Sequence, residues 1–178
     1  MTVTALVLAV LAFLIALRSR GELALLRERL ERLEAHARGG DDPAELAEAL
    51  RVQQGFLARL AAGERLDPEQ VREGRCWSDV DPARAAELVE GGARVLDVRT
   101  PQETLAGVIP GALRIPVDEL PGRLGELGRK SVPTLVYCAM GVRSAAACEL
   151  LGREGFDAVY NLEAGYGTWA GPTERPGA

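Results

Sequence analysis

Residues 132–144 read VPTLVYCAMGVRS, an apolar run that reaches a cysteine and continues into a helix-like segment. The run from Thr134 to Tyr137 is apolar, β-branched and aromatic, which is typical of a buried strand. In open α/β sheets, ligands bind beyond the carboxyl ends of the strands, where a loop leads into the next helix. Cys138 stands at such an end. The stretch therefore predicts a sulfur nucleophile in a loop between a strand and a helix.

Strands and helices alternate on both sides of this stretch, from about residue 76 onward. Caps, turn residues and short apolar runs predict a helix from Asp81-Pro82 through Leu88, strands Arg94–Val98 and Leu113–Ile115, a helix near Val117–Leu127, a helix from about Arg143 to Glu154, and a last strand Val159–Leu162. Alternating units of this length favour a mainly parallel sheet with helices on both faces. We therefore expect an α/β domain over residues 76–178.

The loop after the strand contains what a reactive thiolate needs. A tight curl would direct backbone N–H groups at the sulfur, and Gly141 can adopt the backbone angles that such a curl requires. The start of the next helix and Arg143 add positive charge, which lowers the pKa of a thiol. His36 is the only histidine and lies in a charged helical stretch, so a cysteine–histidine relay is not indicated. Around the catalytic pair Cys138 and Arg143, the residues expected to form the anion-binding loop are Ala139, Met140, Gly141, Val142 and Ser144.

Composition excludes several classes of function. The net charge is −5 and the isoelectric point is near 5.1, whereas nucleic-acid binders carry clustered positive charge, so we expect no nucleic-acid partner. The three cysteines lack the spacing of a zinc site or a disulfide framework, and we expect no metal and no cofactor. Cys148 is interpreted as a buried apolar residue, although a resolving role stays open, and Cys76 as structural.

The first residues predict a membrane anchor. Residues 1–17 carry no charge, and Arg18-Ser19-Arg20 follows at once. A signal peptide is the rival interpretation, but no positive segment precedes the apolar run and no small-residue cleavage site follows it. The positive flank lies on the carboxyl side, so the positive-inside rule predicts one transmembrane helix over residues 1–20 of the cell (inner) membrane, with the remaining chain in the cytoplasm.

A helical stalk is predicted over residues 21–75. Leucines at positions 23, 26, 30 and 33 form a heptad seam of about two repeats. Two alternatives stay open for this short coiled-coil segment, namely a homodimer through the stalk or packing on the next helix. The segment Gly39–Pro43 ends the first helix, and Pro43 and Asp67-Pro68 begin two further helices.

Four blocks in this order resemble the single-domain rhodaneses over roughly residues 77–172. The blocks are LDVRTPQE (96–103), GVIPGA (107–112), CAMGVRS (138–144) and NLEAGYGTW (161–169). The resemblance implies a sulfurtransferase in which Cys138 takes sulfur from a small donor such as thiosulfate or a persulfide. The sulfur is then held as a persulfide and passed to a thiol or to cyanide. It also implies that the amides of residues 139–143 cradle the sulfur and that Arg143 binds anions.

The remaining acidic and basic residues near the strand end are interpreted as support. Asp97, Arg99 and Glu103 resemble a catalytic acid cluster, but an ion pair that braces the strand end is the simpler interpretation.

The sequence also suggests two rival functions. Cysteine phosphatases and arsenate reductases resemble this arrangement of thiolate, amides and arginine, but their loop is longer, whereas only residues 139–142 separate Cys138 from Arg143 here. The alternative from another class is a membrane-tethered docking or sensing module without catalysis.

Overall fold

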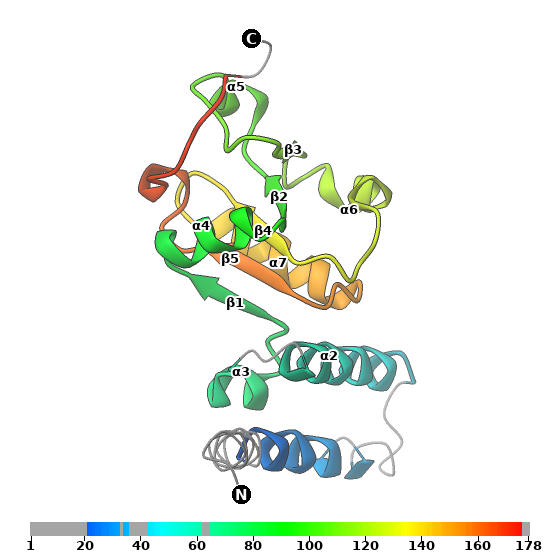
Figure 1. Ribbon diagram of the computed structural model, residues 1–178. Helices are drawn as coiled ribbons and strands as arrows, with labels where there is room; N and C mark the ends of the chain where they lie inside the picture. Colours follow the sequence, from blue (N-terminus) through cyan, green and yellow to red (C-terminus); the bar gives the residue numbers. More distant parts are fainter. Residues whose placement is uncertain (1–20, 33, 36–42, 62–64, 176–178) are drawn as a thin grey trace, which may run out of the picture. The chain divides into compact units, whose positions relative to one another are not determined.

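The computed structural model describes residues 21–32, 34–35, 43–61 and 65–175 (Figure 1). The chain divides into two compact units, Met1–Gly74 and Arg75–Ala178. Each unit is described separately.

The described residues of the first unit form helical segments at residues 21–35 (with residue 33 not described), α2 (Pro43–Ala61) and α3 (Pro68–Glu73). Asp67 caps α3 by accepting a hydrogen bond from the Glu69 amide at 2.8 Å, as the Asp67-Pro68 pair predicts. Leu26 is buried, and its carbonyl accepts a hydrogen bond from Gln53 Nε2 of α2 at 2.9 Å. The predicted coiled coil is not supported: among the described seam residues, Leu26 is buried beside α2, whereas Leu23 and Leu30 stay exposed.

The predicted transmembrane anchor, residues 1–20, lies outside the described residues. In the part of the chain that the structure describes, no helix combines the length and the apolar character needed to cross a membrane.

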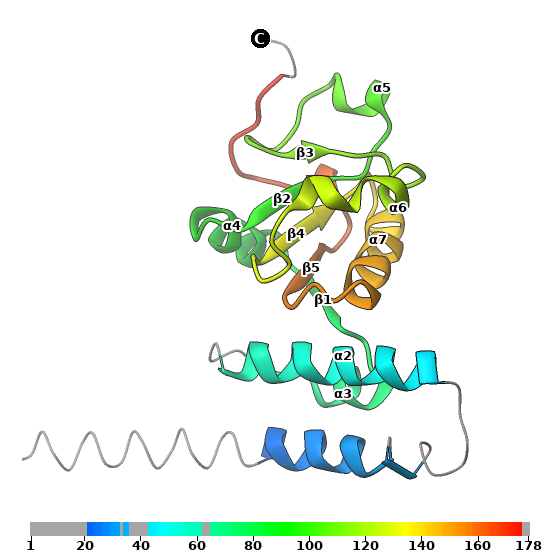
Figure 2. The ribbon, with the colours of Figure 1, turned by 90° about the vertical axis from the view of Figure 1, so that its right-hand side faces the viewer.

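The second unit is built on a five-stranded sheet whose pairings are all parallel, in the order β1-β5-β4-β2-β3. Its elements in chain order are β1 (Trp77–Val80), α4 (Pro82–Glu90), β2 (Arg94–Asp97), α5 (Pro101–Thr104), β3 (Leu113–Arg114), α6 (Leu120–Arg123), η1 (Leu124–Leu127), β4 (Thr134–Tyr137), α7 (Val142–Arg153), β5 (Val159–Leu162) and η2 (Tyr166–Thr168). In Figure 2, α4 covers one face of the sheet and α7 covers the other. The predicted α/β fold with a mainly parallel sheet is confirmed.

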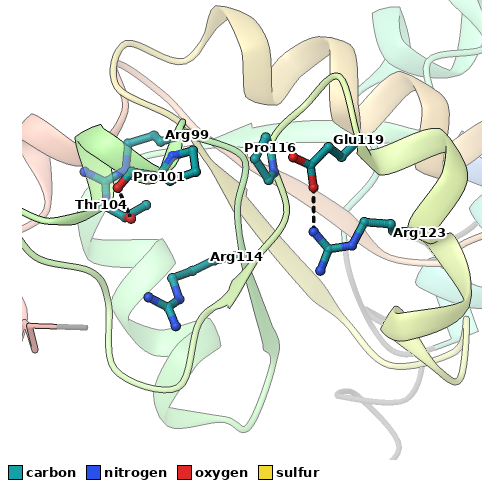
Figure 3. Close-up of a pocket in the computed structure, with 7 residues that line it drawn as sticks. All are labelled: Arg99, Pro101, Thr104, Arg114, Pro116, Glu119 and Arg123. Carbon is teal, nitrogen blue, oxygen red and sulfur yellow. Dashed lines mark hydrogen bonds and ion pairs between the residues drawn. The ribbon is translucent and has the colours of Figure 1, made fainter. Parts of the chain in front are cut away.

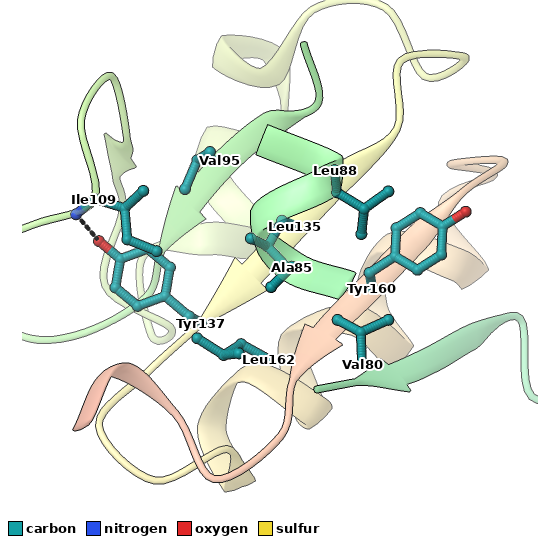
Figure 4. Packing of buried hydrophobic residues seen from close by; sticks show 9 residues of the cluster. All are labelled: Val80, Ala85, Leu88, Val95, Ile109, Leu135, Tyr137, Tyr160 and Leu162. Atoms are coloured by element: carbon teal, nitrogen blue, oxygen red, sulfur yellow. Dashed lines mark hydrogen bonds between the residues drawn. The ribbon is translucent and has the colours of Figure 1, made fainter. Parts of the chain in front are cut away.

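The hydrophobic core on the α4 face explains why the strands hold their register. Ala85 and Leu88 of α4 pack on alternate residues of the central strands (Figure 4). Tyr137 is fully buried at the end of β4, and its hydroxyl accepts a hydrogen bond from the Ile109 amide at 3.1 Å. Since side chains alternate across a strand, the residue after Tyr137 points to the opposite face of the sheet. The core thereby directs Cys138 toward the side covered by α7.

Several elements differ from the sequence predictions. The edge strand β1 was not expected, because its sequence WSDV lacks a continuous apolar run. The helix expected over Val117–Leu127 divides into the short α6 and a 3-10 turn, since Pro121-Gly122 and Gly125 interrupt the helical hydrogen bonds. The four-residue helix α5 lies between β2 and β3, where no helix was predicted.

Candidate active site

Cys138 lies at the carboxyl end of β4, directly before the loop that leads into α7. The Val98 amide donates to the Tyr137 carbonyl at 3.0 Å, so β2 holds the strand up to the residue before the cysteine. Cys138 is only 1% exposed. A reactant must therefore present an atom to the sulfur at the bottom of the loop.

The loop after Cys138 curls so that hydrogen-bond donors converge on the sulfur. The Gly141 amide lies 3.1 Å from Sγ, and the backbone N–H groups of Met140 and Ser144 are also directed at it. The Ser144 hydroxyl lies 3.4 Å from Sγ and 3.0 Å from the Gly141 carbonyl oxygen. A hydroxyl has one proton, so Ser144 donates to one of these two acceptors at a time. The loop is thus a cradle for a negative charge at the sulfur.

This cradle changes the acidity of the thiol. Burial would raise the pKa of Cys138, but hydrogen bonds from the Ser144 side chain and from the amides of Ser144, Met140 and Gly141 outweigh burial and lower the pKa. Hydrogen bonds to the charged form favour that form. A thiolate can therefore form at Cys138 without a histidine.

Two glycines allow the loop to close this tightly. Gly141 has a φ of +88°, a left-handed conformation that favours glycine. Gly165 follows β5 with a φ of +76°, and a Cβ there would lie 2.5 Å from the carbonyl carbon and oxygen of Ala139. The next amide, of Tyr166, donates to the Cys138 carbonyl at 2.8 Å. The segment after β5 therefore supports the loop from behind.

Arg143 lies in the first turn of α7 and is paired with Glu103 of α5. Its Nη2 and Nη1 atoms lie 2.6 and 2.9 Å from the two carboxylate oxygens of Glu103. Hydrogen bonds from Arg143 and from the Thr100 backbone lower the pKa of Glu103 to about 2. Glu103 and Cys138 both raise the pKa of Arg143. The arginine predicted to bind anions is thus an oriented cation whose charge is partly neutralised.

Asp97 and Arg99 form a buried ion pair that is separate from the pair of Glu103 and Arg143. Arg99 donates to both Asp97 oxygens, with Nη2 at 2.6 Å, and to the Gly107 carbonyl at 2.8 Å. Its guanidinium carbon lies 3.9 Å from the centre of the Tyr166 ring. The pair links the end of β2 to neighbouring loops.

The other predicted loop residues point in different directions. Met140 and Val142 are 79% and 78% exposed, so their side chains form the outer rim and only the Met140 amide faces the sulfur. Ala139 is half-buried. Cys76 and Cys148 are buried free thiols, and burial raises the pKa of Cys148 well above its usual value. The surroundings of Cys138 thus favour a thiolate, whereas those of Cys148 favour the neutral thiol.

Gly165 and Tyr166 belong to the site, although the sequence pattern predicts no site role for either residue. Gly165 accommodates the loop backbone, while Tyr166 contributes an amide to Cys138 and a ring to Arg99. The quoted block NLEAGYGTW contains both residues. Their spacing carries no local signal, because the partner loop lies more than twenty residues earlier in the chain.

Comparison with known proteins identifies the fold family. Residues 81–171, half of the chain, match the rhodanese-like domain family. The chain belongs to this family. The match spans β2, β4 and β5 and includes the Cys138 loop, so the geometry above is that of a rhodanese-like domain.

Relatives of this rhodanese-like domain include named sulfurtransferases. A sulfurtransferase of Allochromatium vinosum is 40% identical over 76 residues, which cover 43% of this chain and 70% of that protein. The human thiosulfate:glutathione sulfurtransferase is 36% identical over 95 residues, covering 46% and 83% respectively. The crystal structure of a rhodanese-like domain protein from Staphylococcus aureus is 31% identical, with a TM-score of 0.50, and covers 55% of this chain and 97% of that chain.

Proposed function

We propose that the chain is a sulfurtransferase that carries sulfane sulfur on Cys138. The observation that supports this most directly is the convergence of backbone amides and the Ser144 hydroxyl on a buried thiol whose pKa they lower. These donors stabilise negative charge at the sulfur, which is electrostatic catalysis by preorganised dipoles. The relatives named sulfurtransferases support the same activity.

The loading step follows from this arrangement. The Cys138 thiolate attacks the outer sulfur of thiosulfate, a bond forms between the two sulfur atoms, and the bond to the sulfonate sulfur breaks. Sulfite leaves with the electron pair, and Cys138 becomes a persulfide whose terminal sulfur is negative. With a persulfide donor, a thiolate leaves in place of sulfite.

The unloading step returns the enzyme to its starting state. A thiolate or cyanide attacks the terminal sulfur of the Cys138 persulfide, and the bond to Sγ breaks. The electron pair stays on Cys138 as a thiolate, which the amides of the loop stabilise again. No additional oxidant or reductant is needed, because the sulfur atom is transferred at the same oxidation level from the donor to Cys138 and from Cys138 to the acceptor.

The experiment for this function is intact-mass measurement after incubation with thiosulfate, and separately with glutathione persulfide. A gain of one sulfur, about 32 Da, that cyanide removes and that Cys138→Ser lacks is the expected result. If the reduced thiol gains no sulfur from either donor, the proposed activity is wrong. That result would favour a docking or sensing module without catalysis. The lowered pKa of Cys138 argues against such a module, because docking does not require a thiolate.

We also propose that this chemistry takes place at the cytoplasmic face of the cell membrane. The support is the uncharged sequence of residues 1–17 and the arginines that follow it. Deleting residues 1–20 is expected to move the protein from the membrane fraction to the soluble fraction. Retention in the membrane fraction after the deletion would contradict this location.

A homodimer through the first unit is a further part of the proposal. Its support is an apolar groove whose exposed leucines come from both helices, namely Leu23, Leu30, Leu50 and Leu57. A second copy of the chain could cover these side chains. Monomeric proteins seldom expose large contiguous apolar patches to water. Cross-linking that is lost in Leu30→Glu would support the dimer, and a monomer at every concentration would exclude it.

A further inference from the structure

A pocket lies at the carboxyl ends of β2 and β3. Arg99, Pro101 and Thr104 line one side of it, and Glu119 and Arg123 line the other (Figure 3). The helix α5 connects this pocket to the reactive loop. It contributes Pro101 and Thr104 to the pocket, while its Glu103 holds Arg143.

Arg114 also lines this pocket, and its side chain differs from those of the other lining arginines. Among the residues that the structure describes, its side chain has no hydrogen-bond or ion-pair partner, and Figure 3 shows its guanidinium between the two sides of the pocket. The other two arginines are occupied. Arg99 is paired with Asp97, and Arg123 bonds Glu119 at 2.7 Å and also Glu126.

The sheet register gives the separation between the backbone of Arg114 and the strand end that precedes Cys138. Asp97 of β2 pairs with Arg114 on one side and with Tyr137 on the other. Two strand spacings therefore separate Arg114 from Tyr137, which is roughly 10 Å between their Cα atoms. Cys138 follows Tyr137 in the chain, so about the length of a small peptide separates the backbone at Arg114 from the strand end that carries the reactive cysteine.

This separation decides which part of a reactant Arg114 can contact. Thiosulfate has its sulfonate group bonded directly to the transferred sulfur, so it cannot bridge the two positions. A guanidinium pairs with carboxylates through a planar set of donors. A thiol with a carboxylate several bonds away from its sulfur could place the sulfur at Cys138 and the carboxylate at Arg114.

We propose that Arg114 is a specificity-determining residue that binds the remote carboxylate of a thiol peptide acceptor. This inference rests on the proposed sulfurtransferase function and names the acceptor class of that site. In the unloading step, the bound peptide thiolate attacks the terminal sulfur of the Cys138 persulfide. The bond to Sγ breaks, Cys138 leaves as a thiolate, and the peptide departs as a persulfide.

The first test measures binding without chemistry. S-methylglutathione carries the carboxylates of a thiol peptide but cannot accept sulfur. Its Kd for the full chain is expected to rise about fivefold in Arg114→Ala and less in Arg114→Lys, as for a partly solvent-screened ion pair. Arg129→Ala is the matched control, since Arg129 is an exposed arginine in the turn before β4, at the opposite edge of the sheet. An unchanged Kd in Arg114→Ala, or no binding to the unaltered chain, would overturn the proposal.

The second test measures sulfur transfer and separates this proposal from the proposed function. Loading of Cys138 by thiosulfate is expected to be equal in the unaltered chain and in Arg114→Ala. The KM for glutathione as acceptor is expected to rise about fivefold in Arg114→Ala, while the rate with 2-mercaptoethanol, which has no carboxylate, stays the same. Equal losses with both thiols would show a structural role and overturn the proposal. Failure of loading in the unaltered chain would instead contradict the proposed function, and the binding test would still decide the role of Arg114.

Discussion

Glu103 and Arg143 are forty residues apart in the chain and hold each other through two hydrogen bonds of 2.6 and 2.9 Å. The capping box of α5 fixes the carboxylate, because Glu103 also accepts a hydrogen bond from the Thr100 amide at 2.8 Å. The pair connects the pocket side of the site to the first turn of α7. It therefore orients Arg143 at the rim of the sulfur cradle.

Glu103→Gln is expected to reduce the rate of Cys138 loading by about fivefold to tenfold while changing stability little. Glutamine keeps the acceptor for the Thr100 amide but removes the charge that orients Arg143. About a third of each side chain is exposed, so the pair contributes at most about 1 kcal/mol to the free energy of unfolding. Loading kinetics and urea unfolding check both statements. Glu87→Gln, which removes an exposed partner of Arg84 on α4, is the control and should load at the normal rate.

Ser144→Ala is expected to raise the pKa of Cys138. The Ser144 hydroxyl is one of the donors that lower this pKa in the folded chain, and its loss leaves the amides to oppose burial alone. Ultraviolet thiolate absorbance, with Cys138→Ser subtracted, should show the titration midpoint at higher pH than in the unaltered chain. Loading at neutral pH should fall several-fold and recover as the pH is raised. A midpoint that does not move would contradict the role given to Ser144.

The same lowered pKa links stability to pH. A thiol with a folded-state pKa below its unfolded value stabilises the fold above the unfolded value, and that contribution is lost as the pH falls through the folded value. The contribution of Glu103 to stability is also lost as the pH falls, but at lower pH. Its pKa of about 2 keeps its carboxylate charged down to strongly acidic conditions. The difference in unfolding free energy between the unaltered chain and Cys138→Ser should therefore grow with rising pH across the thiol titration. A constant difference would contradict this linkage.

Gly165→Ala is expected to destabilise the second unit and to slow loading together. The added Cβ would lie 2.5 Å from the Ala139 carbonyl group and would require a φ of +76° from alanine. Clash and strain of this kind cost about 1–3 kcal/mol. Gly167→Ala is the matched control, because no atom lies within 4 Å of its added Cβ. Equal unfolding midpoints for the two variants would show that the segment after β5 does not support the Cys138 loop.

Buried strands of this fold could be predicted from the sequence because their signal is local. The strands β4 (Thr134–Tyr137) and β5 (Val159–Leu162) occur where their runs predict them. The edge strand β1 was missed because its sequence lacks an apolar run, and it gains its pairing only from β5. Because Cys138 directly follows an apolar run, the sequence also predicted correctly that it lies at the end of a strand. The residues of the cradle could be predicted in the same way, because they are consecutive in the loop after Cys138.

Partners that are distant in the sequence could not be predicted in the same way. Glu103 was grouped with Asp97 and Arg99 because the three are neighbours in the chain. In the structure, α5 turns the Glu103 carboxylate toward Arg143, and Arg99 is left with Asp97 alone as its carboxylate partner. Likewise, only the folded sheet brings Gly165 against the loop and places Arg114 two strands from Tyr137. These contacts depend on topology, which local sequence patterns do not encode.

The buried pair of Asp97 and Arg99 gives the last prediction. Arg99 is 4% exposed and Asp97 is fully buried, so either charge left alone would lie in the protein interior without its partner. Arg99→Ala is expected to lower the free energy of unfolding by about 3–5 kcal/mol, whereas Arg84→Ala, which breaks an exposed pair, should cost less than about 1 kcal/mol. Urea unfolding of the single variants and of Asp97→Asn with Arg99→Ala completes a double-mutant cycle. Because most of the single-variant loss comes from the unpaired charge, the double variant should be much more stable than the sum of the two losses predicts. Strictly additive losses would show that the two side chains act independently and that the pair does not brace the end of β2.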